Sequence, residues 1–202
     1  MGARQEAAMS PPCMSCVERV EQVFTGCFGS SLRTRLQGGA AEPLYQPAAK
    51  AGDFHVLHYR ADYFASALHE VAHWCIAGEI RRQQTDFGYW YAPDGRSPAQ
   101  QRAFERVECR PQALEWYFSK ACAHRFRLSM DNLQGIEGDA PHASDFARSV
   151  YAQALQLQRS GLPARAAAFF QGLCREFGTP VDPADLQFSM DEVNCWRARA
   201  PG

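Results

Sequence analysis

The sequence has few lysines and almost no net charge. Lys50 and Lys120 are the only lysines, so its 21 basic residues are nearly all arginines, and the formal net charge is −1. A chain this close to neutrality exerts no general electrostatic attraction on nucleic acid or on an anionic membrane surface. We therefore expect neither nucleic acid nor a membrane among its partners.

Long apolar runs are also lacking. No stretch reaches the roughly 18 apolar residues that a transmembrane helix needs. The first residues, MGARQEAAMSPP, contain no apolar segment of the kind found in signal peptides. We expect a cytoplasmic protein, whose eight cysteines would stay reduced.

A second C-x-x-C pair is missing as well. Cys13 and Cys16 form one such pair, whereas a structural zinc site usually needs two. A redox-active pair would need a βαβ unit around it, and this end of the chain does not predict one. We assign the pair no function. Residues 1–14, with two adjacent prolines, are expected to form a flexible tail, and residues 15–202 a single catalytic metal-binding domain.

Helical periodicity dominates that domain. Apolar residues that recur every three or four positions predict helices over residues 17–27, 62–82, 97–124, 142–159 and 163–177. Asp62 is the expected N-cap of the second helix, and Pro111 is expected to interrupt or restart the third. The remaining C-terminal residues predict loop with one short helical turn.

Strand signals are few. Residues 54–59, FHVLHY, predict a strand, and a second short strand is expected from residue 125. The segment 38–52 is rich in Gly, Ala and Pro and is expected to be irregular. With 46% hydrophobic residues the chain can bury one sizeable core. The predicted class is α+β: one mainly helical domain with a small β component.

The second helix carries an H-E-x-x-H motif formed by His69, Glu70 and His73. Histidines four residues apart lie on nearly the same helix face and can bind one metal ion. Between Tyr63 and Gly78 the only charged residue is Glu70, so this helix is apolar on all sides and should be buried. Because a buried imidazole needs a polar partner, we predict a metal site on a zincin-like active-site helix.

A third ligand must come from another part of the chain. His124, His142 and several carboxylates are candidates. In the helix that contains AFERVECRPQALEW, Glu108 and Glu115 project to the margin of the apolar face, and Glu105 projects further toward solvent. Since carboxylates are rarely buried without a partner, we choose Glu108 as the third ligand. Glu115 is expected either to orient one of the histidines or to form an ordinary ion pair.

Two histidines and one carboxylate suit two different chemistries. With zinc, Glu70 would be the general base of a metallopeptidase. With iron, the same three ligands form the facial triad of non-heme oxygenases. Helical spacing does not distinguish the two metals, and Glu70 is the candidate catalytic residue.

Five stretches of the sequence match a known family. They are EPLYQPA (42–48), YFASALHEVAHWCIAG (63–78), DFGYWYAPDGR (86–96), FERVECRPQALEW (104–116) and DNLQG (131–135). The chain resembles the bacterial elongation factor P hydroxylases over about residues 17–177. The resemblance implies a monooxygenase that uses non-heme iron and O₂, with His69, His73 and a later glutamate, placed here at Glu108, as metal ligands.

The resemblance also implies the substrate, a lysine side chain of elongation factor P that has first been extended with β-lysine. It favours iron, whereas the bare H-E-x-x-H motif would have favoured zinc. The zinc metallopeptidase is the alternative function.

An aromatic and acidic loop follows the motif helix. A long cationic side chain would be held by aromatic faces and carboxylates, so this loop is the candidate wall of a substrate channel. The alternative is an ordinary core and turn segment, since Asp94-Gly95 favours a tight turn. The candidate substrate-binding residues are Asp86, Tyr89, Trp90, Asp94 and, in a later loop, Asp131.

Overall fold

Helices make up most of the computed structural model, which describes residues 15–88, 97–129 and 140–193. The α-helices are α1 (Cys16–Phe28), α2 (Phe64–Ile76), α3 (Pro98–Ala121), α4 (Ala140–Ser160), α5 (Ala164–Phe177) and α6 (Met190–Val193). The strands are β1 (Thr34–Ala40), β2 (Leu44–Gln46) and β3 (His55–Arg60), and short 3₁₀ helices are η1 (Arg81–Gln83), η2 (Thr85–Gly88) and η3 (Pro183–Asp185). The prediction of a mainly helical domain with a small β component is confirmed. The predicted tail, residues 1–14, lies outside the described residues.

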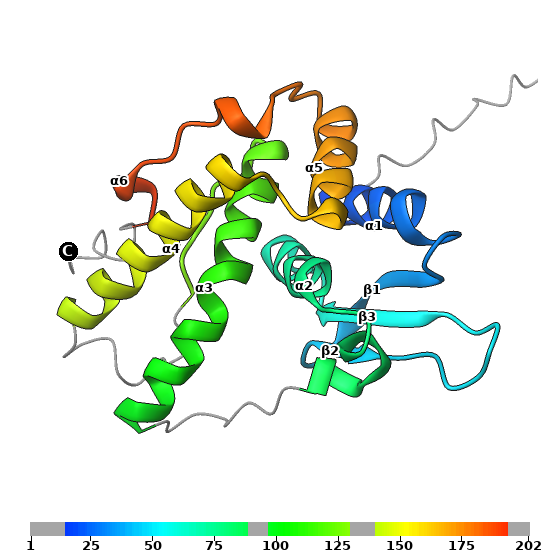
Figure 1. Cartoon of the computed structure of the whole chain (residues 1–202). Coiled ribbons are helices and arrows are strands. Elements are labelled where there is room, and N and C mark those ends of the chain that lie inside the picture. Colours follow the sequence, from blue (N-terminus) through cyan, green and yellow to red (C-terminus); the bar gives the residue numbers. More distant parts are fainter. Residues whose placement is uncertain (1–14, 89–96, 130–139, 194–202) are drawn as a thin grey trace, which may run out of the picture.

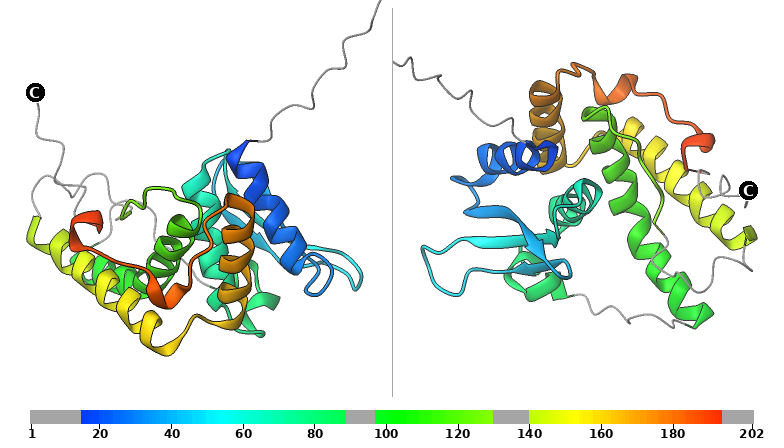
Figure 2. Two further views of the ribbon diagram at one scale, coloured as in Figure 1. Left: turned by 90° about the horizontal axis from the view of Figure 1, so that it is seen from above. Right: turned by 180° about the vertical axis from the view of Figure 1, so that it is seen from behind.

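The sheet and the long helices enclose α2. The strand order is β1-β3-β2, with β1 parallel and β2 antiparallel to β3. Helix α2 lies between this sheet and the long helices α3 and α4, while α1 and α5 pack together at the adjacent end (Figures 1 and 2). The helix that carries the H-E-x-x-H motif is therefore the central element of the fold.

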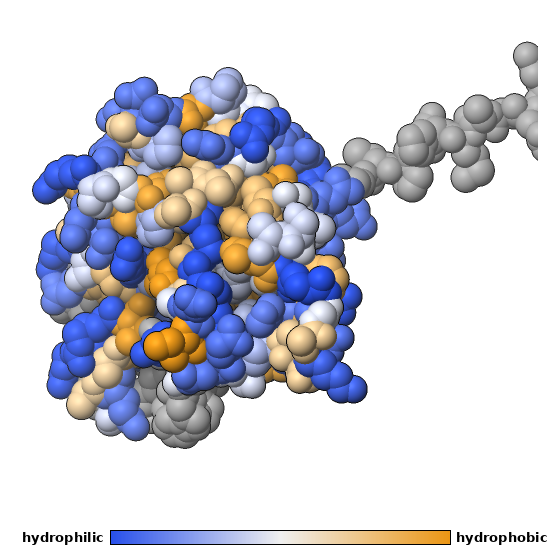
Figure 3. Space-filling view, turned by 45° about the vertical axis from the view of Figure 1, so that its right-hand side comes forward, coloured by the Kyte–Doolittle hydropathy of each residue, from blue (hydrophilic) through white to orange (hydrophobic). Residues whose placement is uncertain are grey.

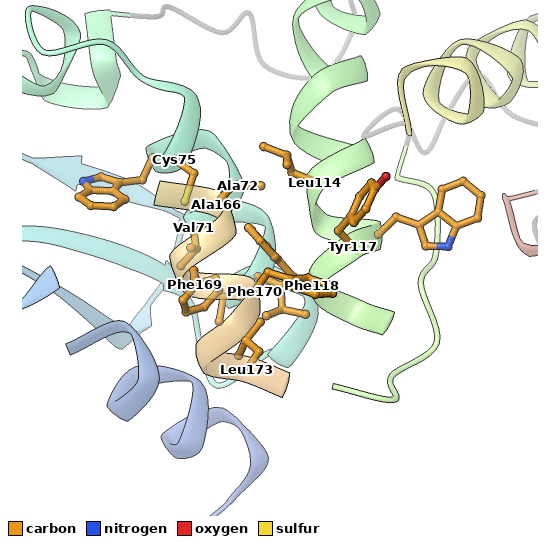
Figure 4. Close-up of a cluster of buried hydrophobic side chains, with 14 of the residues drawn as sticks. Val71, Ala72, Cys75, Leu114, Tyr117, Phe118, Ala166, Phe169, Phe170 and Leu173 are labelled. Atoms are coloured by element: carbon orange, nitrogen blue, oxygen red, sulfur yellow. The ribbon is translucent and has the colours of Figure 1, made fainter. Parts of the chain in front are cut away.

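A hydrophobic cluster fixes α2 in this position. Val71 and Ala72 of α2 face side chains of α3 and α5 (Figure 4). Phe118 of α3 and Phe169 of α5 pack edge to face with ring centroids 5.0 Å apart. Trp74 is fully buried against α1, with its ring centroid 5.1 Å from that of Phe24. Packing on three sides confirms that α2 is buried, as its sequence predicts.

Helix α2 is shorter than predicted. It ends at Ile76 and not near Arg82, because Ala77 is extended (φ −62, ψ 124). The expected N-cap Asp62 is also wrong: the cap position is Tyr63, whose side chain makes no capping hydrogen bond. Packing rather than capping therefore sets where this helix begins.

Helix α3 is slightly shorter than predicted but more regular. It runs without a break through Pro111. A capping box starts it, in which the Ser97 side chain accepts from the backbone of Gln100 and the Gln100 side chain accepts from the backbone of Ser97. The missing N–H of Pro111 costs one hydrogen bond, and the tertiary contacts of α3 with α2, α4 and α5 outweigh that loss.

The strand predictions are only partly right. The predicted strand over 54–59 is confirmed as β3, but the segment expected to be irregular contains part of β1 and the whole of β2. The strand expected from residue 125 does not form within residues 125–129. There the Gln112 side chain donates to the Ser129 carbonyl (2.6 Å) and accepts from its N–H (3.0 Å), so one side chain pairs with the backbone as a neighbouring strand would.

The surface is mixed in character. Hydrophilic and hydrophobic residues are interspersed on the face shown in Figure 3. None of the described helices combines the length and the apolar character needed to cross a bilayer.

The C-terminal end of α2 is capped by Arg165 of α5. Its Nη2 donates to the carbonyls of Cys75 (3.0 Å), Trp74 (3.2 Å) and Ala77. Its guanidinium also lies 5.0 Å from the Trp74 ring centroid. We expect Arg165→Ala to lower the free energy of unfolding by about 2–3 kcal/mol, since the carbonyls of Trp74 and Cys75 lose hydrogen bonds from a charged donor. The Ala77 carbonyl keeps a second donor, Arg82 Nη1 at 3.0 Å.

Urea unfolding measures this change. Arg175→Ala is the control, because Arg175 lies on the same helix but is exposed, and a surface substitution of this kind changes stability by about 0.5 kcal/mol or less. Equal losses in the two variants would show that Arg165 does not hold the end of α2.

Candidate metal centre and its cavity

Three potential metal ligands meet between α2 and α3. The Nε2 atoms of His69 and His73 lie 3.1 Å apart, one helical turn from each other on α2. From α3, the Glu108 carboxylate approaches both: Oε2 lies 3.2 Å from His69 Nε2 and Oε1 lies 3.3 Å from His73 Nε2. Each of the three residues offers a ligand atom within 4.8 Å of the others. The structure thus brings together the three side chains that the sequence analysis selected.

Glu115 lies behind His69. Its Oε2 is 2.8 Å from His69 Nδ1, and its side chain is buried. When the Nδ1–H group of neutral His69 donates a hydrogen bond to this carboxylate, Nε2 carries no proton and is free to bind a metal. The contact matches the orienting role considered for Glu115 in the sequence analysis.

Histidines and carboxylates neutralise one another in this cluster. Burial lowers the pKa of His69, but hydrogen bonds to Glu108 and Glu115 outweigh it and raise that pKa well above its usual value. Burial raises the pKa of Glu108, but the charges and hydrogen bonds of His73 and His69 outweigh it and hold this pKa well below its usual range. Burial raises the pKa of Glu115. A metal ion would take the place of the proton shared between the imidazoles and Glu108.

The ligand atoms determine which metals this site could bind. Two imidazole nitrogens and one carboxylate oxygen form the set used by non-heme iron oxygenases, and the same set also binds catalytic zinc. The residues therefore fit a divalent transition metal. The donor atoms alone do not select iron over zinc.

A cavity of about 700 Å³ opens onto this cluster. Three further carboxylates line it, those of Glu42, Glu70 and Asp86, while Arg60 and Arg127 are its arginines among the described residues. Burial raises the pKa of Glu70, and the charges of Glu108 and Asp86 add to that effect, while His69 and His73 oppose it. The cavity is acidic and suits a cationic ligand.

Asp86 reaches the cavity from a strained turn. Asp86 (φ 48) and Phe87 (φ 57) both have left-handed backbone conformations, which cost about 1–2 kcal/mol each for residues other than glycine. The Asp86 carboxylate accepts from the Tyr45 N–H (2.8 Å), and the Phe87 ring stacks on the Tyr45 ring at 4.4 Å. Such strain is typical of functional sites. Four other candidates lie outside the described residues: Tyr89, Trp90, Asp94 and Asp131.

Helix α3 carries a buried polar stripe that was not predicted from the sequence. Gln112 lies between Glu108 and Glu115 and lines the cavity. Glu105, which we expected to project toward solvent, is buried, with 8% of its surface exposed. Spacings of four and three residues are a recognisable signal, since they place polar side chains on one helix face. The stripe consists of Gln101, Glu105, Glu108, Gln112, Glu115 and Ser119.

Of the two other histidines considered as ligands, His124 does not join the cluster. His124 is exposed, and its ring centroid lies 4.7 Å from that of Phe64. His142 lies on α4, and its side chain is outside the described part of the structure.

Comparison with known proteins assigns the chain to a family. The family model for elongation factor P hydroxylase matches residues 23–188. A relative from Haemophilus influenzae named elongation factor P lysine hydroxylase is 40% identical over 179 residues, which cover 89% of this chain and 97% of that protein. This family is the one that the sequence motifs indicated. The chain belongs to the elongation factor P hydroxylase family.

Proposed function

We propose that this chain is a cytoplasmic non-heme iron monooxygenase that adds a hydroxyl group to a lysine side chain of elongation factor P, after that lysine has been extended with β-lysine. The name of the relative, elongation factor P lysine hydroxylase, supports the reaction and the protein substrate. The observation that carries the proposal is the convergence of His69, His73 and Glu108 beneath an acidic cavity. Residues 15–202 would act as one catalytic domain.

Iron is the proposed metal, held by His69 and His73 on a zincin-like helix, α2, and by Glu108 on α3. An unactivated C–H bond is too inert for side-chain acids, bases and nucleophiles, so a bound iron would supply the activation of O₂. The family match favours this chemistry over the zinc metallopeptidase that the H-E-x-x-H motif alone allows.

The protein's own residues would bind and orient the substrate. A β-lysylated lysine is long and carries ammonium groups, and the carboxylates of Glu42 and Asp86 line the cavity where such groups would enter. Tyr45 holds Asp86 in place through its backbone N–H. We assign the aromatic loop with Tyr89, Trp90 and Asp94, and the later Asp131, to the same task, which is to fix a flexible chain so that one carbon lies at the metal.

Glu70 would move protons. Hydroxylation balances as C–H + O₂ + 2e⁻ + 2H⁺ → C–OH + H₂O, so two protons enter for each turnover. The Glu70 carboxyl lines the cavity beside the histidines, and its raised pKa lets it carry a proton closer to neutral pH than an ordinary carboxyl does. Glu115 would keep His69 in the orientation that the metal needs.

Mass spectrometry tests the reaction. With iron, O₂ and a reductant, the protein is expected to raise the mass of β-lysylated elongation factor P by one oxygen atom. Unmodified elongation factor P is expected to react at least about 10-fold less efficiently, because it lacks ammonium groups whose hydrogen bonds to carboxylates contribute about 1.5–3 kcal/mol each. Tandem spectra of the modified peptide locate the added oxygen.

The controls separate the two chemistries. The added oxygen should come from ¹⁸O₂ when labelled gas is supplied, and His73→Ala should abolish the mass gain. Peptide cleavage by the zinc-loaded protein, with no oxygen added by the iron-loaded protein, would overturn the proposal.

A further inference from the structure

A second cavity lies beside the metal centre. It encloses about 660 Å³ between the C-terminal end of α2, the segment that follows it, and α3. His73 lines both this cavity and the acidic one. Nothing in the mechanism above uses it, although it reaches a proposed metal ligand.

Three arginines surround this second cavity, which we name the arginine cavity after Arg81, Arg106 and Arg110. Arg106 and Arg110 are four residues apart on α3, so they lie on the same face of that helix. Arg81, in η1, donates to the Phe87 carbonyl at 3.1 Å, which holds it at the cavity wall. Among the described lining residues, Glu79 is the one carboxylate.

The two cavities therefore have opposite charge. The acidic cavity is lined by five carboxylates and two arginines, and the arginine cavity by three arginines and one carboxylate. His73 stands where they meet. This arrangement allows two ligands of opposite charge to approach the metal centre without competing for one site.

Size and lining define the ligand of the arginine cavity. Its volume is within the range of small-molecule sites, roughly 300–1,000 Å³. Guanidinium groups bind carboxylates and phosphates through paired hydrogen bonds. Ile76, Val107 and the strongly exposed Ile80 add apolar surface that a carbon skeleton can cover.

We propose that the arginine cavity binds a small organic anion with two or more carboxylate or phosphate groups, next to His73. Binding rests on this cavity alone, whereas a role in turnover rests on the proposed function. Hydroxylation consumes two electrons and two protons beyond O₂. A bound organic anion that is oxidised by two electrons and releases two protons would supply both beside the metal centre.

Calorimetric titration of the full chain tests binding without turnover. The probes are succinate, a dicarboxylate, and pyrophosphate, a polyphosphate, at low ionic strength, where charge interactions are least screened. Saturable binding of at least one probe with a stoichiometry near one is expected, and the probe that binds identifies the source chemistry. Absence of saturable binding with both would overturn the proposal.

The double variant Arg106→Gln/Arg110→Gln locates the site. It should weaken binding at least about 10-fold, since both guanidinium groups that would form paired hydrogen bonds with the anion lose their charge. Arg102→Gln is the control, because Arg102 is an exposed residue of α3 outside the arginine cavity. Circular dichroism checks that the double variant folds, and Arg106→Lys/Arg110→Lys, which keeps the charge, should bind more tightly than the glutamine pair. Equal affinity in wild type and both double variants would refute the site.

Two further outcomes separate this proposal from others. Binding of a tetra-glutamate peptide that depends on Arg106 and Arg110, with no binding of either small probe, would overturn the small-anion assignment and indicate a protein contact surface. Hydroxylation by a protein that binds no anion would refute this inference and leave the proposed function standing. Anion binding without hydroxylation would support the site and refute the proposed function.

Discussion

Replacing His69, His73 or Glu108 by alanine is expected to remove most of the bound metal and to lower the hydroxylation rate at least about 100-fold. Their ligand atoms lie within 4.8 Å of one another, so each variant leaves two donors where three converge. Two donors hold an ion poorly, because the affinity of the site depends on the complete set of deprotonated ligands. Elemental analysis of protein purified without air, followed by single-turnover assays, measures both effects.

Two glutamates on the same helix serve as matched variants. Glu105→Gln should keep its metal, because Glu105 is buried on the same stripe but is not one of the three clustered ligands. Glu115→Gln should lower metal affinity about 10- to 100-fold, the usual effect of removing the partner that orients a histidine ligand. Full metal content in Glu108→Ala, together with metal loss in Glu105→Gln or Glu115→Gln, would show that the third ligand is misassigned.

Local sequence was enough to find the centre of this site. The spacing of His69 and His73 and the apolar surroundings of the motif depend only on one helix, so they could be predicted from the sequence. Glu108 could be selected because burial of a carboxylate at the margin of an apolar face is costly without a partner. The structure places all three side chains together.

Long-range contacts explain what the sequence did not predict. The end of α2 depends on Arg165, about ninety residues later, which binds the last carbonyls of the helix. Strand β1 forms because it pairs in parallel with β3 across an intervening segment. Within residues 125–129 the expected strand does not form, and there the side chain of Gln112 pairs with the backbone of Ser129. Each of these partners lies far along the sequence from the residues that it contacts. Local periodicity therefore does not reveal them.

The polar stripe on α3 shows a different limit. On a helical wheel Glu105 projects toward solvent if the apolar face of the helix is taken as the buried face. In the structure the stripe of glutamates and glutamines is itself buried, and part of it faces the histidines of α2 and the cavity. Buried polar residues along one helix face depart from ordinary helix patterning, and such departures are expected at functional sites.

Glu70→Gln is expected to lower the turnover number about 100-fold or more while the metal content stays at the wild-type level. Glu70 lines the acidic cavity but is not one of the three clustered ligands. Burial, together with the charges of Glu108 and Asp86, raises its pKa, so its carboxyl group can hold and release a proton under working conditions. Glutamine has the same size but transfers no proton, and loss of a positioned acid or base costs about 100- to 10,000-fold.

The kinetic constants distinguish this role from substrate binding. Asp86→Asn and Glu42→Gln remove carboxylates from the same cavity, and we expect them to raise KM with little change in kcat, because they would hold the substrate's ammonium groups equally in the ground and transition states. Glu70→Gln should instead lower kcat with little change in KM. A Glu70→Gln protein that turns over at the wild-type rate would exclude a proton-transfer role for this residue, and a rise in KM alone would place Glu70 with the substrate-binding carboxylates.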